Sequence, residues 1–165
     1  MEAMRACPVP LPCRGGFDAS STLANRITVN RKIEMNILLS IKPKWARLIY
    51  EGKKTIEWRK STPNAYRPGM RVYLYESTPV QKVTGYFNYQ AFYAHLNSNK
   101  PEVNLKEIDD LVKQGCVPFE KLKAYQGDSD RIVGWIVKNP TKLDIPMDLA
   151  DFGIKRPPQS WRYVE

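Results

Sequence analysis

A hydroxyl, a carboxylate and a guanidinium alternate along one short stretch of the chain. Thr55, Glu57 and Arg59 occupy every second position of the segment TIEWR, and Lys54 directly precedes them. In a β-strand alternate side chains share a face, so these three polar groups would converge, with Lys54 joining them from the loop. Arginine binds phosphate bidentately or stacks on a base, and a carboxylate accepts from base N–H groups. The set suits a nucleotide ligand; the alternative is a Glu57–Arg59 ion pair that only closes the fold.

Positive charge is concentrated around this segment. The chain has 26 Lys and Arg against 17 Asp and Glu, a formal charge of +9. Residues 42–71 contain nine of the basic residues and two acidic ones, so this stretch alone contributes +7. Such a field attracts phosphates, although a solvated basic surface kept for solubility would have the same composition. We expect Lys44, Lys53 and Lys60 to contact phosphates.

Hydrophobic patterning predicts the elements that position these residues. Alternation and runs of β-branched or aromatic residues indicate strands at 36–42, 55–59, 71–77, 82–93, 131–138 and 161–164. Helical spacing predicts a helix from Pro43 to Glu51, a second over 105–115 and a short helical segment over 119–125. Strands dominate without a repeated βαβ unit. The expected class is therefore α+β, a small closed or nearly closed β-barrel with helices packed at its openings.

The first 34 residues differ in character from the rest. They contain three prolines and two adjacent glycines with no sustained helix or strand periodicity, which is typical of a disordered extension. The prolines at 8, 10 and 12 also interrupt any apolar run of signal-peptide type, so we expect a cytoplasmic location. Dense patterning begins at Met35. We therefore expect one domain over 35–165, with Met35 as the natural start and 1–34 as a dispensable tail or an upstream-start artefact.

Two classes of site receive no support from the composition. No stretch approaches the roughly 18 uninterrupted apolar residues of a membrane span, so we expect no membrane partner. Cys7, Cys13 and Cys116 show no CxxC spacing, and His95 is the single histidine. We therefore expect neither a metal site nor a cofactor.

A longer series of motifs resembles the ASCH branch of the PUA-like superfamily. The motifs are LSIKPKWA at 39–46, GKKTIEWRK at 52–60, VYLYESTP at 72–79 and PPQSWRY at 157–163. They are similar to bacterial and phage members and span most of 35–165. The resemblance implies a PUA-like β-barrel whose polar cleft, between barrel and helix, receives a nucleotide or base, from RNA rather than DNA, or a free modified nucleoside. The ligand-binding residues expected there are Lys42, Lys54, Thr55, Glu57, Arg59, Ser77, Gln159, Ser160 and Trp161, the last of which could instead belong to the core.

The same resemblance leaves an enzymatic alternative open. Some ASCH proteins are small hydrolases that remove an acyl group from a modified cytidine, using a lysine and a threonine on this strand. Lys54 corresponds to that lysine, but Glu57 stands at the threonine position. A carboxylate is a poor replacement for a hydroxyl nucleophile, although it can act as a general base. We therefore expect a binding module rather than an enzyme, with Lys54 and Glu57 as the catalytic pair of the hydrolase alternative and a protein-interaction domain as a third possibility.

Overall fold

The computed structural model describes residues 35–65, 67, 69–97 and 105–165, of which 91–97 and 105–108 by their backbone alone. The extension predicted at 1–34 lies outside these residues. The strands are β1 (Asn36–Ile41), β2 (Ile56–Arg59), β3 (Arg71–Glu76), β4 (Lys82–Asn97), β5 (Arg131–Met147) and β6 (Trp161–Val164). The helices are α1 (Pro43–Tyr50), α2 (Leu105–Gly115) and α3 (Phe119–Gln126), and a short 3₁₀ helix, η1, covers Leu149–Phe152.

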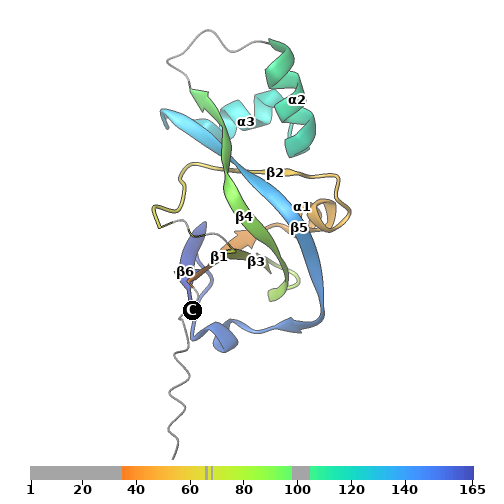
Figure 1. Ribbon diagram of the computed structural model, residues 1–165, viewed down its shortest axis with the longest axis vertical. Helices are drawn as coiled ribbons and strands as arrows, with labels where there is room; N and C mark the ends of the chain where they lie inside the picture. The colour runs from red at the N-terminus through yellow and green to blue at the C-terminus, as the bar shows by residue number, and fades with distance from the viewer. Residues whose placement is uncertain (1–34, 66, 68, 98–104) are drawn as a thin grey trace, which may run out of the picture. The chain divides into compact units, whose positions relative to one another are not determined.

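The six strands form one mixed sheet in the order β2-β5-β4-β3-β1-β6 (Figure 1). β1 runs parallel to β3, and the other neighbouring strands are antiparallel. The sheet curls until its two edge strands approach each other. Arg59 of β2 donates from Nη1 to Ser160 Oγ beside β6 at 3.4 Å, and Trp161 Nε1 donates to Ser61 Oγ at 3.0 Å. Side chains rather than a backbone ladder therefore connect the two edges of this half-barrel.

The two longest strands, β4 and β5, extend further than the sequence predicts. β4 reaches Asn97 instead of 93, and β5 reaches Met147 instead of 138. Asn139 and Pro140 read as a strand end, yet they lie at a register shift between the pairs Asn88–Lys138 and Tyr86–Thr141. A β-bulge tolerates both the positive φ of Asn139 and a proline, and it increases the local bend of the strand. The bulge therefore continues the strand and contributes to the curl.

The main hydrophobic core fills the concave side of the sheet under α1. Ile37 and Leu39 of β1, together with Val72 and Leu74 of β3, are fully buried there. Trp135 of β5 lies at its centre with no exposed surface, and its Nε1 donates to the Ser61 carbonyl at 3.1 Å. These four residues occupy alternate positions of their strands, so they point to one face of the sheet. The alternation in RVYLYE indicates this for β3, whereas NILLSI is an aliphatic run that is buried on both faces.

Two smaller clusters cover the remaining apolar surfaces. In the first, Ile56 and Trp58 of β2 pack with Ile132 of β5 and Leu122 of α3. In the second, Tyr75 packs with residues on the convex side of the sheet, namely Leu38, Val83, Ile154 and Val164. Tyr73, which lies on the same face of β3 as the buried Tyr75, is half-buried at the edge of this second cluster.

Candidate functional site

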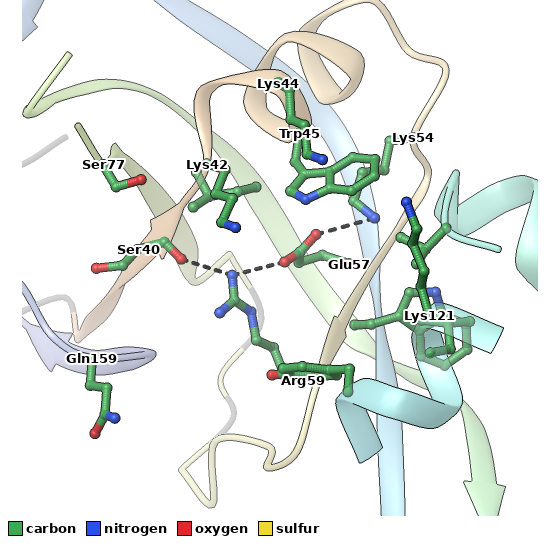
Figure 2. A pocket seen from close by; sticks show the side chains of 15 residues that line it. Ser40, Lys42, Lys44, Trp45, Lys54, Glu57, Arg59, Ser77, Lys121 and Gln159 are labelled. Carbon is green, nitrogen blue, oxygen red and sulfur yellow. Dashed lines mark hydrogen bonds and ion pairs between the residues drawn. The ribbon is translucent and has the colours of Figure 1, made fainter. Parts of the chain in front are cut away.

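A cleft of about 560 Å³ lies where β1 passes into α1, opposite β2 and α3 (Figure 2). This volume lies within the range of about 300–1,000 Å³ that is usual for small-molecule sites. The residues that line it are Ser40, Ile41, Lys42, Lys44, Trp45, Lys54, Glu57, Trp58, Arg59, Ser77, Val117, Lys121, Leu122, Tyr125 and Gln159. Five of these carry positive charge and one carries negative charge, so the lining has a formal charge of +4. An anionic ligand is favoured.

A buried ion network forms the floor of the cleft. The Glu57 carboxylate accepts from Arg59 Nη2 at 2.8 Å through one oxygen and lies 3.3 Å from Lys54 Nζ through the other. Only 7% of the Glu57 side chain, 1% of Lys54 and 11% of Arg59 are exposed. Since burying a charge without a partner is costly, the carboxylate and its two cations depend on one another. Figure 2 shows this chain of interactions running from Ser40 through Arg59 and Glu57 to Lys54.

The end of α1 and the end of α2 hold Lys54 in place. The backbone N–H groups of Lys53 and Lys54 donate to the Leu48 carbonyl, so the chain reverses directly into β2. Lys54 Nζ donates to the Gly115 carbonyl at the end of α2 and lies 5.3 Å from the centre of the Trp45 ring. A carbonyl, a carboxylate and an aromatic face thus surround the ammonium group. Such a lysine is engaged as a structural cation.

Arg59 connects β2 to the opposite edge of the sheet. Its Nη2 donates to the Ser40 carbonyl at 2.9 Å, in addition to its ion pair with Glu57. Its Nη1 reaches Ser160 Oγ at 3.4 Å. The guanidinium is therefore fixed in orientation by β1, β2 and the residue before β6, which leaves little side-chain freedom to be lost when a ligand binds.

Exposed cations surround this fixed floor. Lys42 and Lys44, which flank Pro43 at the start of α1, are exposed, as is Lys121 of α3. Lys44 Nζ lies 4.5 Å from the centre of the Trp45 ring, a cation–π contact. The first turn of α1 contains no acidic residue, so no carboxylate offsets the positive end of the helix there. These lysines can move toward an anion without disturbing the core.

Tyr125 is the exposed aromatic residue of the cleft. Of the three aromatic side chains that line it, Trp58 is 5% exposed, Trp45 is half-buried beneath two lysines, and Tyr125 is 41% exposed. Burial raises the pKa of the Tyr125 hydroxyl, while the Arg59 guanidinium lowers it and the Glu57 carboxylate raises it. The hydroxyl consequently stays neutral near neutral pH and adds no charge to the cleft.

Seven of the residues predicted from the sequence line this cleft. They are Lys42, Lys44, Lys54, Glu57, Arg59, Ser77 and Gln159. Glu57 and Arg59 lie on the same side of β2, as strand alternation predicts. The roles assigned to these residues stay predictions, but their side chains are brought together.

Five other predicted residues are placed elsewhere. Thr55 lies just before β2, where its backbone N–H donates to the Gln114 carbonyl, and it is exposed outside the cleft. Ser160 Oγ accepts from Arg59 Nη1 and does not line the cleft, and the Trp161 ring packs edge-to-face against Trp135 at 5.6 Å.

The other two, Lys53 and Lys60, are engaged outside the cleft. Lys53 pairs with Glu51 at 2.8 Å, and Lys60 lies 5.4 Å from the centre of the Tyr125 ring. Neither is among the residues that line the cleft. Lys60 nonetheless lies next to one of them.

The sequence did not indicate the contribution of α3. The cleft is lined by three residues of α3, Lys121, Leu122 and Tyr125, and by Val117 just before that helix. They follow β2 by about sixty residues along the chain. The segment FEKLKAYQ has only two buried residues, Leu122 and Gln126, and no polar motif. Its proximity to Glu57 depends on the packing of α3 against β2, which local pattern does not reveal.

Within the described ranges, no group of three or more His, Cys, Asp or Glu side chains could hold a metal ion. Over the same part of the chain, no helix is long and apolar enough to cross a membrane. Cys116, the one described cysteine, is a free thiol whose Sγ lies 3.3 Å from the Lys53 carbonyl.

Solved structures from Zymomonas mobilis share this fold. The crystal structure of ASCH from that organism is 19% identical and superimposes with a TM-score of 0.64, covering 79% of this chain and 87% of that one. Two single-residue variants of the same protein give the same score and cover 88% and 90% of their own chains. The predicted α+β, PUA-like fold is thereby confirmed.

Sequence comparison shows which family the chain belongs to. Large ribosomal subunit protein uL22 of two Ureaplasma parvum serovar 3 strains is 23% identical over 134 residues, which are 78% of this chain. The chain spans 39% of the length of these curated relatives. The family model described as "ASCH domain" matches residues 39–146, the segment that carries α1, β2 and most of the cleft. The chain belongs to the ASCH domain family.

Proposed function

We propose that the cleft binds RNA, with its lysine rim on the phosphates and its floor against a nucleotide. The observation that carries this proposal is the combination of five cations with a single carboxylate in one cleft of about 560 Å³. Electrostatic attraction of this kind supplies essentially all of the affinity of non-specific nucleic-acid binding. Aromatic residues beside the cations supply stacking surfaces, the second component of single-strand recognition.

Two further observations favour RNA. The chain belongs to the ASCH family. Its resemblance to that family implies a cleft for a nucleotide or base, from RNA rather than DNA. The curated relatives are named as proteins of the large ribosomal subunit, a particle rich in RNA. We expect RNA to bind more tightly than DNA of the same sequence.

The hydrolase alternative would require Lys54 and Glu57 to act on an acylated cytidine. Lys54 is 1% exposed and donates to a backbone carbonyl, while both oxygens of Glu57 face cations. A general base needs a lone pair directed at a water or substrate. We therefore expect no release of the acyl group when the full chain is incubated with an N-acylated cytidine.

The rim lysines provide the direct test. Lys42, Lys44 and Lys121 are replaced together by glutamine, and binding of a fluorescent single-stranded RNA is measured over a range of salt concentrations. Each phosphate contact contributes roughly 0.7 to the slope of log affinity against log salt for single strands. Loss of three contacts should therefore reduce the slope by about 2.

A second triple variant is the matched control. Lys138, Lys142 and Lys155 are also exposed, and none of them lines the cleft. Replacing them by glutamine removes the same net charge and should leave the slope unchanged. Equal losses in the two variants would show that RNA responds only to net charge. A wild-type chain that binds neither RNA nor DNA while it binds a protein partner would favour the protein-interaction alternative.

A further inference from the structure

The two ends of the cleft differ in chemistry. One end is lined by Ser40, Ser77 and Gln159, with the exposed Lys42 between them and the floor. The other end is lined by Val117, Leu122 and Tyr125. Figure 2 shows Ser77, Ser40 and Gln159 on one side of Arg59 and Lys121 on the other. The cleft is therefore polar at the β1–β3 end and apolar and aromatic at the α3 end.

A nucleotide has the same asymmetry. Its base is a flat, largely apolar surface with polar edges, and its phosphate is a compact anion. Leu122 is fully buried and Val117 packs beside it, so the α3 end of the cleft has an apolar wall. Tyr125 adds the exposed ring at that end, on which a base can stack.

Exposed cations occur at both ends, and they differ in the polar side chains that accompany them. Lys54 is enclosed between the Gly115 carbonyl and Glu57. Lys121 is exposed on α3, on the side of the apolar wall. Lys42 is exposed at the other end, where the Ser77 hydroxyl and the Gln159 amide can add donors to an anion.

We infer that the cleft holds a single unstacked nucleotide in one orientation, with its base on Tyr125 at the α3 end and its phosphate at Lys42. The inference rests on the proposed function and makes it more specific. Arg59, held by Glu57 and the Ser40 carbonyl, lies between the two subsites and faces the sugar. Two ligands meet this description: a nucleoside with one phosphate on its 5′ oxygen, and a nucleoside with one phosphate on its 3′ oxygen.

The experiment compares a nucleoside with its 5′- and 3′-monophosphates by NMR titration of the full chain. Tyr125→Ala should weaken all three ligands by about the same factor, roughly tenfold, because each loses a stacking partner. Lys42→Gln should weaken only the monophosphates, by about tenfold, and leave the nucleoside unchanged. Lys138→Gln removes an exposed lysine that does not line the cleft, so it is the matched control and should affect neither class. Lys121→Gln, at the α3 end of the cleft, tests the reverse orientation and should weaken the monophosphates less than Lys42→Gln does.

The outcomes separate this inference from the proposed function. If Lys121→Gln rather than Lys42→Gln removes the advantage of the phosphate, the orientation is reversed and the inference is overturned. If the chain binds an RNA oligomer but none of the three single-nucleotide ligands, the inference fails while the proposed function stands. If it binds neither oligomer nor nucleotide, the proposed function fails. Preference for one monophosphate over the other, lost in Lys42→Gln, would support the inference and fix the polarity of the strand.

Discussion

Replacing Glu57 by glutamine tests whether the floor of the cleft is held by charge. Glutamine keeps the shape of the side chain and one acceptor oxygen, so packing is conserved and only the negative charge is lost. In the wild type that charge lies 2.8 Å from Arg59 Nη2 and 3.3 Å from Lys54 Nζ, and at most 11% of any of the three side chains is exposed. The variant therefore leaves two buried cations with no counter-charge.

The expected destabilisation follows from that geometry. Breaking a buried ion pair by removing one partner costs about 3–5 kcal/mol. A domain of this size has a total free energy of unfolding of about 5–15 kcal/mol, so the loss is a large fraction of it. At roughly 2–4 °C per kcal/mol, Tm should fall by about 6–20 °C. Calorimetry and urea unfolding of the purified variant measure both quantities.

Glu51→Gln is the matched control for this measurement. Glu51 also has two basic partners, Lys53 at 2.8 Å and Arg47 at 3.7 Å, but its side chain is 38% exposed. Exposed pairs contribute little because solvent screens them, so Tm should hardly change. Adding Lys54→Met to Glu57→Gln should restore part of the lost stability by removing one unpaired charge. Equal Tm values for Glu57→Gln and Glu51→Gln would refute the argument that the network is buried and interdependent.

Two other substitutions test the packing around the cleft. A methyl group at Gly115 would lie 2.1 Å from Nε1 of the buried Trp58 ring, so Gly115→Ala should lower the urea midpoint by an amount equivalent to about 1–3 kcal/mol and change tryptophan fluorescence. An unchanged midpoint would show that α2 can move away from β2 without cost. Burial raises the pKa of Tyr50, whose hydroxyl bonds to Thr84 at 2.7 Å, to about 12. This raised pKa stabilises the fold below pH 10, and the contribution is lost as pH rises through about 12. Between pH 10 and about pH 12 the urea midpoint should therefore fall more steeply with pH in wild type than in Tyr50→Phe. Parallel plots of midpoint against pH for the two proteins would contradict the assignment.

The elements of the fold are predictable here because their patterns are local. Alternation in TIEWR and RVYLYES places β2 and β3, and Pro43 marks the first turn of α1. Alternation also predicts that Glu57 and Arg59 share a face, which their 2.8 Å ion pair bears out. Fully local information is enough for these features, since each depends on residues that are close together in sequence.

The α3 side of the cleft could not be predicted in this way. Lys121, Leu122 and Tyr125 reach the cleft because α3 packs on Ile56 and Trp58 in a separate apolar cluster, and KLKAY has no pattern that identifies a partner strand. Conversely, Lys53 belongs to a basic run but pairs with Glu51, two residues before it. Charge runs predict that a cationic surface exists; they do not predict which cations remain available to a ligand.

Burial divides the cleft into two parts whose substitutions should have different consequences. Arg59 is held by Glu57, by the Ser40 carbonyl and by Ser160, so its orientation is set when the chain folds and not when a ligand arrives. The cost of ordering that side chain then falls on folding, which leaves more of the contact energy for binding. The exposed lysines at 42, 44 and 121 have no such constraint and can follow phosphates of varied geometry. A substitution at the floor should therefore lower Tm more than it lowers affinity for the ligand. A substitution at the rim should lower the affinity and leave Tm unchanged.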